Sequence, residues 1–343
     1  MDRYFYFDDI FEDYTKYSLK ISKSLYLKSG LYPIIDQGKE EIAGYSNKNI
    51  NIFDKIPVII FGDHTRIFKY VDYPFFLGAD GVKILKNTSN LFLDKYLYYS
   101  LKNFKIPNTG YNRHFKWLKD FKIKYISLAK QKRITSLIEK IEFFILKKEK
   151  QLEYLKELKK SLFTKYSKNK KVVNLELEEI CEFIKDGTHQ TPTYVNINEN
   201  GYKFLSSKDV SKGIINWDNT KYISEELHKE LYKKIAPRKN DILLAKNGTT
   251  GVAALVDKEE IFDIYVSLAI LRLKKEYNPK YILEGINSIE TNQQFKRSLK
   301  GIGVPNLHLK EIKKVKIPIP PIELQNKFAQ RVEKIEKLSF NFY

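Results

Sequence analysis

Residues 114–144 recur at 308–338, at a constant offset of 194 and without a gap. Ten of the 31 aligned positions are identical, including Gln131 with Gln325 and the run Glu139–Glu142 with Glu333–Glu336. A lysine-rich composition makes single matches common, but four consecutive matches in the same register as the glutamine pair indicate a tandem duplication. The chain of 343 residues is therefore predicted to contain two similar units.

Each repeat closes a longer block, and the two blocks share one organisation. They open with related segments, 7–12 and 177–182. Short β-rich runs bounded by Gly, Asn and Asp then predict strands, and helical patterns follow at about 93–104 and 279–299. The predicted strands lie at 57–61, 75–77, 82–85, 241–245, 251–256 and 266–271. This order predicts an α+β fold for each unit and not a βαβ alternation.

The segment between the blocks is predicted to be one long helix. No Gly or Pro occurs from Ser127 to about Tyr166, and the apolar residues follow the 4–3 spacing of a coiled-coil seam. At 1.5 Å per residue, such a helix is roughly 60 Å long. The helix of the second repeat, from Ile322, is its predicted antiparallel partner, and it is shorter because only 22 residues follow Pro321. The residues predicted to bind a partner are Ile134, Ile138, Ile141, Ile145, Leu152, Leu155, Gln325, Phe328 and Val332.

The charge is concentrated in this connector. The chain has a net charge of +19, and residues 116–171 hold 18 basic and 6 acidic side chains, whereas residues 172–300 hold 19 of each. Such an excess indicates a polyanion or an acidic protein as partner, although lysine-rich helices are also often simply solvated. The sequence has no apolar run long enough to span a membrane, no signal peptide and a single cysteine, Cys181. We therefore expect no membrane partner, no disulfide and a cytoplasmic location.

The motifs that carry catalysis are missing from the sequence. There is no GxxxxGK[ST] loop, no HExxH and no CxxC pair, and the five histidines have no metal-ligand spacing. The Pro320-Pro321 pair is flanked by isoleucines, whereas an aminomethyltransferase loop would need Asn or Asp before it and an aromatic residue after it. We predict no catalytic residue and no metal site in this chain.

Several motifs, taken with the two-copy arrangement, resemble the specificity subunit of type I restriction–modification systems. The segment Ile317–Gln325 resembles the proline-rich helix start of that family, and Tyr32–Gln37, Val58–Arg66 and Leu77–Gly81 resemble one type of its target-recognition domain. The first helix start, Ile126–Gln131, lacks the prolines. The resemblance covers nearly the whole chain.

This resemblance implies an α+β chain of two target-recognition domains, 1–125 and 169–317. A long antiparallel coiled-coil spacer, formed by the central helix 126–168 and the short C-terminal helix 318–343, separates them. It also implies a non-catalytic subunit whose two domains each read one half of a bipartite, asymmetric site in double-stranded DNA. The helices would dock two methyltransferase subunits, and motor-nuclease subunits would join for restriction. No cofactor is expected on this chain, and S-adenosylmethionine would be held by the methyltransferase partner.

A DNA-reading domain needs polar side chains on loops that reach base edges. Both blocks place such loops after predicted strands, although the same residue types also form ordinary surface turns. The predicted DNA-binding residues are Asp63, His64, Thr65, Arg66, Tyr111, Asn112 and Arg113 in the first block, and Thr188, His189, Gln190, Thr191, Ser206, Ser207, Lys208, Lys246, Asn247, Thr249 and Asn306 in the second.

Two other functions remain open from the residues alone. One is a coiled-coil scaffold that binds proteins and has no DNA specificity of its own. The other is a fragment of a single-chain restriction enzyme, separated from its catalytic part. The connector lysines likewise have two explanations, contact with DNA between the half-sites or contact with an acidic partner, and we favour the partner because the seam needs a protein neighbour in any case.

Overall fold

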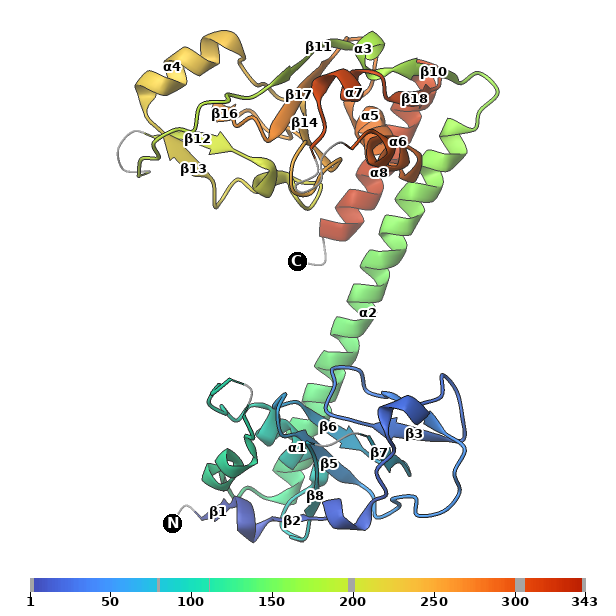
Figure 1. The fold of residues 1–343 in the computed structure, drawn as a ribbon, viewed down its shortest axis with the longest axis vertical. Helices are drawn as coiled ribbons and strands as arrows, with labels where there is room; N and C mark the ends of the chain where they lie inside the picture. Colours follow the sequence, from blue (N-terminus) through green and yellow to red (C-terminus); the bar gives the residue numbers. More distant parts are fainter. Residues whose placement is uncertain (1–2, 79–80, 111, 197–200, 300–305, 341–343) are drawn as a thin grey trace. The chain divides into compact units, whose positions relative to one another are not determined.

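A single helix, α2 (Leu128–Ser167), connects the two units of the chain (Figure 1). The computed structural model describes residues 3–78, 81–110, 112–196, 201–299 and 306–340. Its internal contacts divide the chain within α2, into unit 1 (1–147) and unit 2 (148–343). The predicted long helix is therefore present, and its 40 residues contribute to both units.

Unit 1 contains a four-stranded sheet of order β2-β8-β5-β6, a three-stranded sheet β4-β3-β7 and a two-stranded ladder β1-β9. All the pairs are antiparallel except β3 with β7. The strands and the helix that precedes the connector are β1 (Tyr4–Tyr6), β2 (Phe11–Asp13), β3 (Tyr32–Ile35), β4 (Gly44–Ser46), β5 (Val58–Gly62), β6 (Phe68–Val71), β7 (Phe76–Leu77), β8 (Val82–Asn87), α1 (Asp94–Lys102) and β9 (Lys122–Lys124). The 3₁₀ turns are η1 (Phe7–Asp9), η2 (Thr15–Tyr17), η3 (Lys23–Leu25) and η4 (Phe115–Asp120).

Unit 2 repeats this topology strand for strand. Its sheets have the orders β11-β17-β14-β15, β13-β12-β16 and β10-β18, and again only one pair, β12 with β16, is parallel. The strands are β10 (Val173–Glu176), β11 (Cys181–Asp186), β12 (Tyr202–Leu205), β13 (Lys221–Ile223), β14 (Ile242–Ala245), β15 (Ala253–Leu255), β16 (Phe262–Ile264), β17 (Leu268–Leu273) and β18 (Lys316–Ile319). The helices are α3 (Leu177–Ile180), η6 (Ser207–Val210), α4 (Glu225–Lys234), α5 (Pro279–Ile286), α6 (Ile289–Ser298), α7 (Leu309–Lys313) and α8 (Ile322–Phe340). The predicted α+β class and internal duplication are confirmed.

One inner strand of each four-stranded sheet, β5 in unit 1 and β14 in unit 2, is buried on both faces. In β5, Ile59 and Phe61 belong to one apolar cluster, whereas Val58 and Ile60 belong to another. In β14 the same alternation divides residues 242–245 between two clusters. Because successive side chains of a strand point to opposite faces, burial on both sides explains why these strands are continuous apolar runs in the sequence.

The repeated glutamine ties each long helix to its unit. The Gln131 side chain is buried, its Oε1 accepts from the Leu93 amide at 2.8 Å and its Nε2 donates to the Ile126 carbonyl at 2.8 Å. Gln325 makes the equivalent bonds, accepting from the Asn278 amide at 2.9 Å and donating to the Pro320 carbonyl at 2.8 Å. Leu93 and Asn278 are the N-caps of α1 and α5, so each glutamine joins the start of two helices.

The predicted antiparallel pairing of α2 and α8 is present within unit 2. Phe328 lies 6.1 Å from Phe163 and 5.8 Å from Tyr166, measured between ring centroids, and Lys159 Nζ lies 3.4 Å from Glu336 Oε1. Residues near the end of α2 therefore contact the start of α8, and earlier residues of α2 contact later residues of α8, so the two helices run antiparallel (Figure 1).

This packing changes the role expected for three seam residues. Gln325, Phe328 and Val332 are all buried inside unit 2, where the chain's own α2, α5 and preceding loop cover them. They bury the start of α8 in its own unit, and the partner contact predicted for them stays a prediction. Leu152 and Leu155 are half-buried, whereas Ile134, Ile141 and Ile145 are exposed.

The glutamine bonds predict a specific loss of stability. Gln325→Leu keeps the size of the side chain but leaves the Asn278 amide and the Pro320 carbonyl without a partner, which costs about 3 kcal/mol at 1–3 kcal/mol per buried group. Hydrogen exchange of the α5 and α8 amides should report an opening free energy lower by this amount. The matched control is Gln330→Leu, at an exposed glutamine of the same helix. Equal protection in the two variants would contradict the proposed role.

Candidate nucleic-acid interface

Three of the predicted loops of unit 2 meet at the segment Tyr265–Ser267, which follows β16. The Val266 amide donates to the Thr188 carbonyl at 2.9 Å. Ser267 accepts twice, through Oγ from the Ser207 amide at 3.0 Å and through its carbonyl from the Lys246 amide at 2.9 Å. The ends of β11, β12, β14 and β16 therefore place loops 187–191, 206–208 and 246–249 side by side.

A fourth loop joins them through backbone bonds. Asn247 and Asn306 form an isolated antiparallel bridge, and the Leu307 amide donates to the Lys246 carbonyl at 3.1 Å. We call loops 187–191, 206–208 and 246–249 together with Asn306 the unit 2 reading cluster. All its predicted DNA-binding side chains except Lys246 are exposed or half-buried.

Two glycines shape this cluster. A Cβ on Gly187 would lie 2.2 Å from the Ile264 carbonyl oxygen, so only glycine lets the loop after β11 pass so close to β16. Gly248 has a φ of +76°, in the left-handed region that glycine adopts without strain, and it turns the chain between Asn247 and Thr249. The conformation of these two loops therefore requires the glycines at positions 187 and 248.

Lys246 is buried and does not project toward solvent. Its side chain is 6% exposed, and its Nζ lies 2.5 Å from Asp186 Oδ1 at the end of β11. An ammonium group held in this way positions the Asp186–Thr191 loop. Lys246 therefore anchors this loop, and the DNA contact predicted for it stays a prediction.

Unit 1 builds a similar cluster after β3, β5 and β7. The His64 amide donates to Gln37 Oε1 at 3.2 Å, and Thr65 Oγ1 donates to the Gln37 carbonyl at 2.7 Å. The Asp63 amide donates to the Gly81 carbonyl at 2.7 Å. Loop 63–66 is thereby held against the ends of two neighbouring strands, with Thr65 exposed and His64 and Arg66 half-buried.

The remaining predicted residues of unit 1 are divided between structural and exposed positions. Asp63 is 4% exposed, and its Oδ1 accepts from the Phe115 amide at 2.7 Å, so it anchors the 112–115 segment. The DNA contact predicted for Asp63 stays a prediction. Asn112 and Arg113 are exposed beside that anchor. Arg66 adopts a φ of +61°, which is unusual for a residue with a Cβ. Tyr111 lies outside the described residues.

Asp63 and Lys246 occupy equivalent positions in the two units. Each is the first residue after the central strand, β5 or β14. Each amide donates to the segment after the parallel strand, at Gly81 or Ser267, and each carbonyl accepts from the segment before η4 or α7, at His114 or Leu307. The backbone bonds are thus duplicated, while the side chains displayed around them differ.

Gln37 and Tyr265–Ser267 organise these clusters but are absent from the predicted site residues. Gln37 follows a β-rich run and precedes Gly38, which is the same turn signal that identified the other loops. Ser267 stands inside the predicted strand 266–271, where its hydroxyl gave no separate signal.

A buried His–Asp pair lies beside the strands that carry the unit 2 reading cluster. His228 Nδ1 of α4 lies 2.7 Å from Asp263 Oδ2 of β16, and the Tyr202 ring stacks on the His228 ring at 3.8 Å. Burial raises the pKa of Asp263 to about 6, although the His228 contact works in the opposite direction. The pair links α4 to β12 and β16, two of the four strands whose ends carry the cluster.

The described residues show no group of three or more His, Cys, Asp or Glu side chains arranged to hold a metal ion. Within the same residues, no helix has both the length and the apolar character needed to cross a membrane.

The model of the family described as type I restriction modification DNA specificity domain matches residues 169–341, half of the chain. This chain belongs to that family. The specificity subunit of the type I restriction enzyme EcoR124I/EcoR124II of Escherichia coli is 25% identical over 96% of this chain and 85% of its own length. The specificity subunit of the MjaVIII enzyme of Methanocaldococcus jannaschii is 26% identical over 77% of this chain and 69% of its own length.

Solved structures agree with the fold of this specificity-family chain. The S subunit of a type I restriction–modification system from M. genitalium superposes with a TM-score of 0.65 at 18% identity, over 100% of this chain and 91% of that one. A chain of a type I restriction–modification assembly gives a TM-score of 0.51 at 14% identity, over 99% and 91% of the two chains. The resemblance to specificity subunits expected from the motifs is confirmed.

The buried carboxyl group predicts a pH-dependent effect of Asp263→Asn. A carboxyl group whose pKa is raised from 3.8 to about 6 on folding stabilises the protein below about pH 4, and this contribution is lost as the pH rises through 6. The variant should therefore gain stability relative to wild type between pH 4.5 and 7.5, by about 1–3 kcal/mol. Thermal melts across this range measure the difference.

Asp218→Asn, at an exposed carboxylate of the same unit, controls for the loss of one negative charge. A melting difference between Asp263→Asn and wild type that stays constant with pH would contradict the account of the buried pair.

Proposed function

We propose that this chain is the DNA-recognition subunit of a type I restriction–modification complex, and that each unit reads one half of a bipartite, asymmetric site. The observation that carries the proposal is the duplicated scaffold at the strand ends. The same backbone bonds hold both clusters, while the exposed and half-buried side chains differ between them, as in Thr65 and Arg66 against Asn247 and Thr249. Two units with the same backbone but different side chains are consistent with recognition of a DNA site whose two halves differ in sequence.

Direct readout is consistent with the side chains that are exposed in both clusters. Hydroxyl, amide and guanidinium groups pair with base edges in the major groove, and each good pair contributes about 1–3 kcal/mol of discrimination. The buried Asp63 and Lys246 hold the loops in place. The proposed base-reading residues are therefore the exposed and half-buried members of the clusters.

Methylation and cleavage are proposed to reside in partner subunits, with S-adenosylmethionine bound by the methyltransferase. We propose that two methyltransferase subunits and the motor-nuclease subunits assemble with this chain. No observation favours the alternative of a protein scaffold without DNA specificity.

The α2 surface of unit 1 supports a protein partner. Ile141 is 50% exposed, whereas Ile335, its equivalent in the repeat, is 7% exposed in unit 2. Ile134, Leu137, Phe144 and Ile145 are also exposed. They lie on one side of the helix by their spacing of three and four residues, and we call them, with Ile141, the α2 stripe. An apolar surface of this kind marks a contact with another protein, and we propose a methyltransferase subunit.

Exchange of one unit tests modular reading. Replacing residues 172–307 by the corresponding segment of another specificity subunit should change one half of the methylated sequence, because the unit 2 reading cluster lies within this segment. Replacing residues 1–113, the counterpart at the 194 offset, should change the other half. Methylome sequencing of the host reads the result, and a change in both halves after a single exchange would refute modular reading.

The α2 stripe gives a separate prediction. The variant Ile141→Asn/Phe144→Asn/Ile145→Asn should lower recovery of the methyltransferase with the tagged chain at least tenfold, because its apolar contact is lost. The matched control is Phe143→Asn/Leu146→Asn, which removes two exposed apolar side chains from other sides of the same helix. Equal recovery with both variants would place the methyltransferase elsewhere on the chain.

A further inference from the structure

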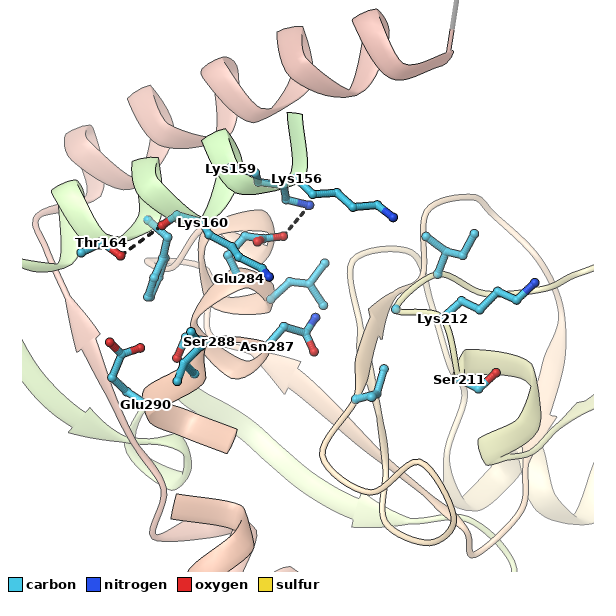
Figure 2. Close-up of a pocket in the computed structure, with 16 residues that line it drawn as sticks. Lys156, Lys159, Lys160, Thr164, Ser211, Lys212, Glu284, Asn287, Ser288 and Glu290 are labelled. Carbon is cyan, nitrogen blue, oxygen red and sulfur yellow. Dashed lines mark hydrogen bonds and ion pairs between the residues drawn. The ribbon is translucent and has the colours of Figure 1, made fainter. Parts of the chain in front are cut away.

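A cleft of about 510 Å³ lies in unit 2 between the end of α2, α5, the start of α6 and the loop after η6. Four lysines line it, namely Lys156, Lys159, Lys160 and Lys212. Figure 2 shows Lys156 extending from α2 toward the loop that carries Lys212. Phe163, Val252 and Leu283 form part of the wall.

Three of these lysines are available to an anion. Lys159 is neutralised within unit 2, where its Nζ lies 2.5 Å from Glu284 and 3.4 Å from Glu336. Lys156, Lys160 and Lys212 are exposed, and among the described residues no carboxylate lies within ion-pair distance of them. Glu284 and Glu290 also line the cleft, and Lys160 acts electrostatically on Glu284 together with Lys159, so the excess positive charge of the cleft is moderate.

The cleft adjoins the unit 2 reading cluster along two segments of chain. Lys212 follows η6, which begins at Ser207 of the cluster. Val252, in the cleft wall, ends the loop that carries Asn247 and Thr249, and the two segments meet where a Cβ on Gly213 would lie 3.9 Å from the Ala253 carbonyl. Two short segments of chain, Ser207–Lys212 and Thr249–Val252, thus join the unit 2 reading cluster to the cleft.

The reading unit needs such a source of positive charge. Residues 172–300 hold 19 basic and 19 acidic side chains, so this block is neutral. Neutralisation of phosphates supplies much of the affinity of proteins for DNA, and apolar walls strengthen the field of the charges that line a cleft. The end of α2 brings lysines from the basic connector to the edge of the neutral block.

We propose that Lys156, Lys160 and Lys212 bind backbone phosphates of the duplex beside the half-site read by unit 2. This inference rests on the proposed DNA-recognition function. It assigns two connector lysines, Lys156 and Lys160, and Lys212 of the loop after η6 to DNA, whereas an acidic segment of a partner protein is the competing occupant.

The test compares Lys156→Gln/Lys160→Gln/Lys212→Gln with a matched control, Lys327→Gln/Lys334→Gln/Lys337→Gln, which removes three exposed lysines of α8. The probe is a fluorescein-labelled 40-base-pair duplex of random sequence, titrated with the full chain alone and with its methyltransferase at several salt concentrations. Loss of three phosphate contacts should flatten the slope of log K against log salt by about 2.7 and weaken binding roughly 100-fold or more at 50 mM salt. The control should lose much less.

The outcomes separate this inference from the proposed function. If both triple variants bind the duplex equally, the lysine site is refuted while DNA recognition stands. If the cleft variant keeps its DNA affinity but no longer recovers the methyltransferase, the cleft holds an acidic protein segment and the inference is overturned. If the wild-type chain binds no duplex, alone or with methyltransferase, the function and the inference fail together. Thermal melts confirm that both variants remain folded.

Discussion

The buried glutamine at the start of each long helix is the contact on which the duplicated architecture depends. A helix start leaves its first backbone amides without intrahelical partners, and burying an unpaired amide or carbonyl is costly. Gln131 and Gln325 satisfy these groups on two elements at once, the preceding loop and the N-cap of α1 or α5. Within unit 1 these bonds hold the start of α2 against the start of α1, and within unit 2 they hold the start of α8 against the start of α5.

Much of the fold followed from local patterns. The central strands β5 and β14 are apolar runs because they are buried on both faces, and the long helix lacks every helix breaker. The short strands β12 and β16 gave no such signal. In β16 the polar Asp263 interrupts the apolar pattern, and it is buried only because His228, 35 residues earlier, bonds to it. A pattern of neighbouring residues cannot reveal His228 as the partner of Asp263, because the two are 35 positions apart.

For the candidate site, the positions of the loops could be predicted from the sequence, but the long-range contacts of their side chains could not. The turn residues after the strands located both clusters, since strand ends and turn chemistry are local properties. The burial of Asp63 and Lys246 was not predicted, for a single reason. Each is buried by a segment far along the chain, Phe115 in one unit and Asp186 in the other, and that burial turns a polar side chain from a contact into an anchor. The glutamine pair was found as a repeat, but its bonds to residues about 40 positions away were not.

The distribution of charge fits a division of work between affinity and specificity. Phosphate contacts position a protein on the duplex but carry no sequence information, whereas base contacts on loops supply it. The loops of unit 2 can vary freely only if the energy of binding does not depend on them. Lysines on α2 meet that requirement, because this helix is held by Gln131 at its start and by Phe163 and Tyr166 near its end, independently of the reading side chains. Because the phosphate contacts come from the basic α2 and the base contacts from the loops of the neutral block, the recognised sequence can change while the affinity supplied by the phosphate contacts is kept.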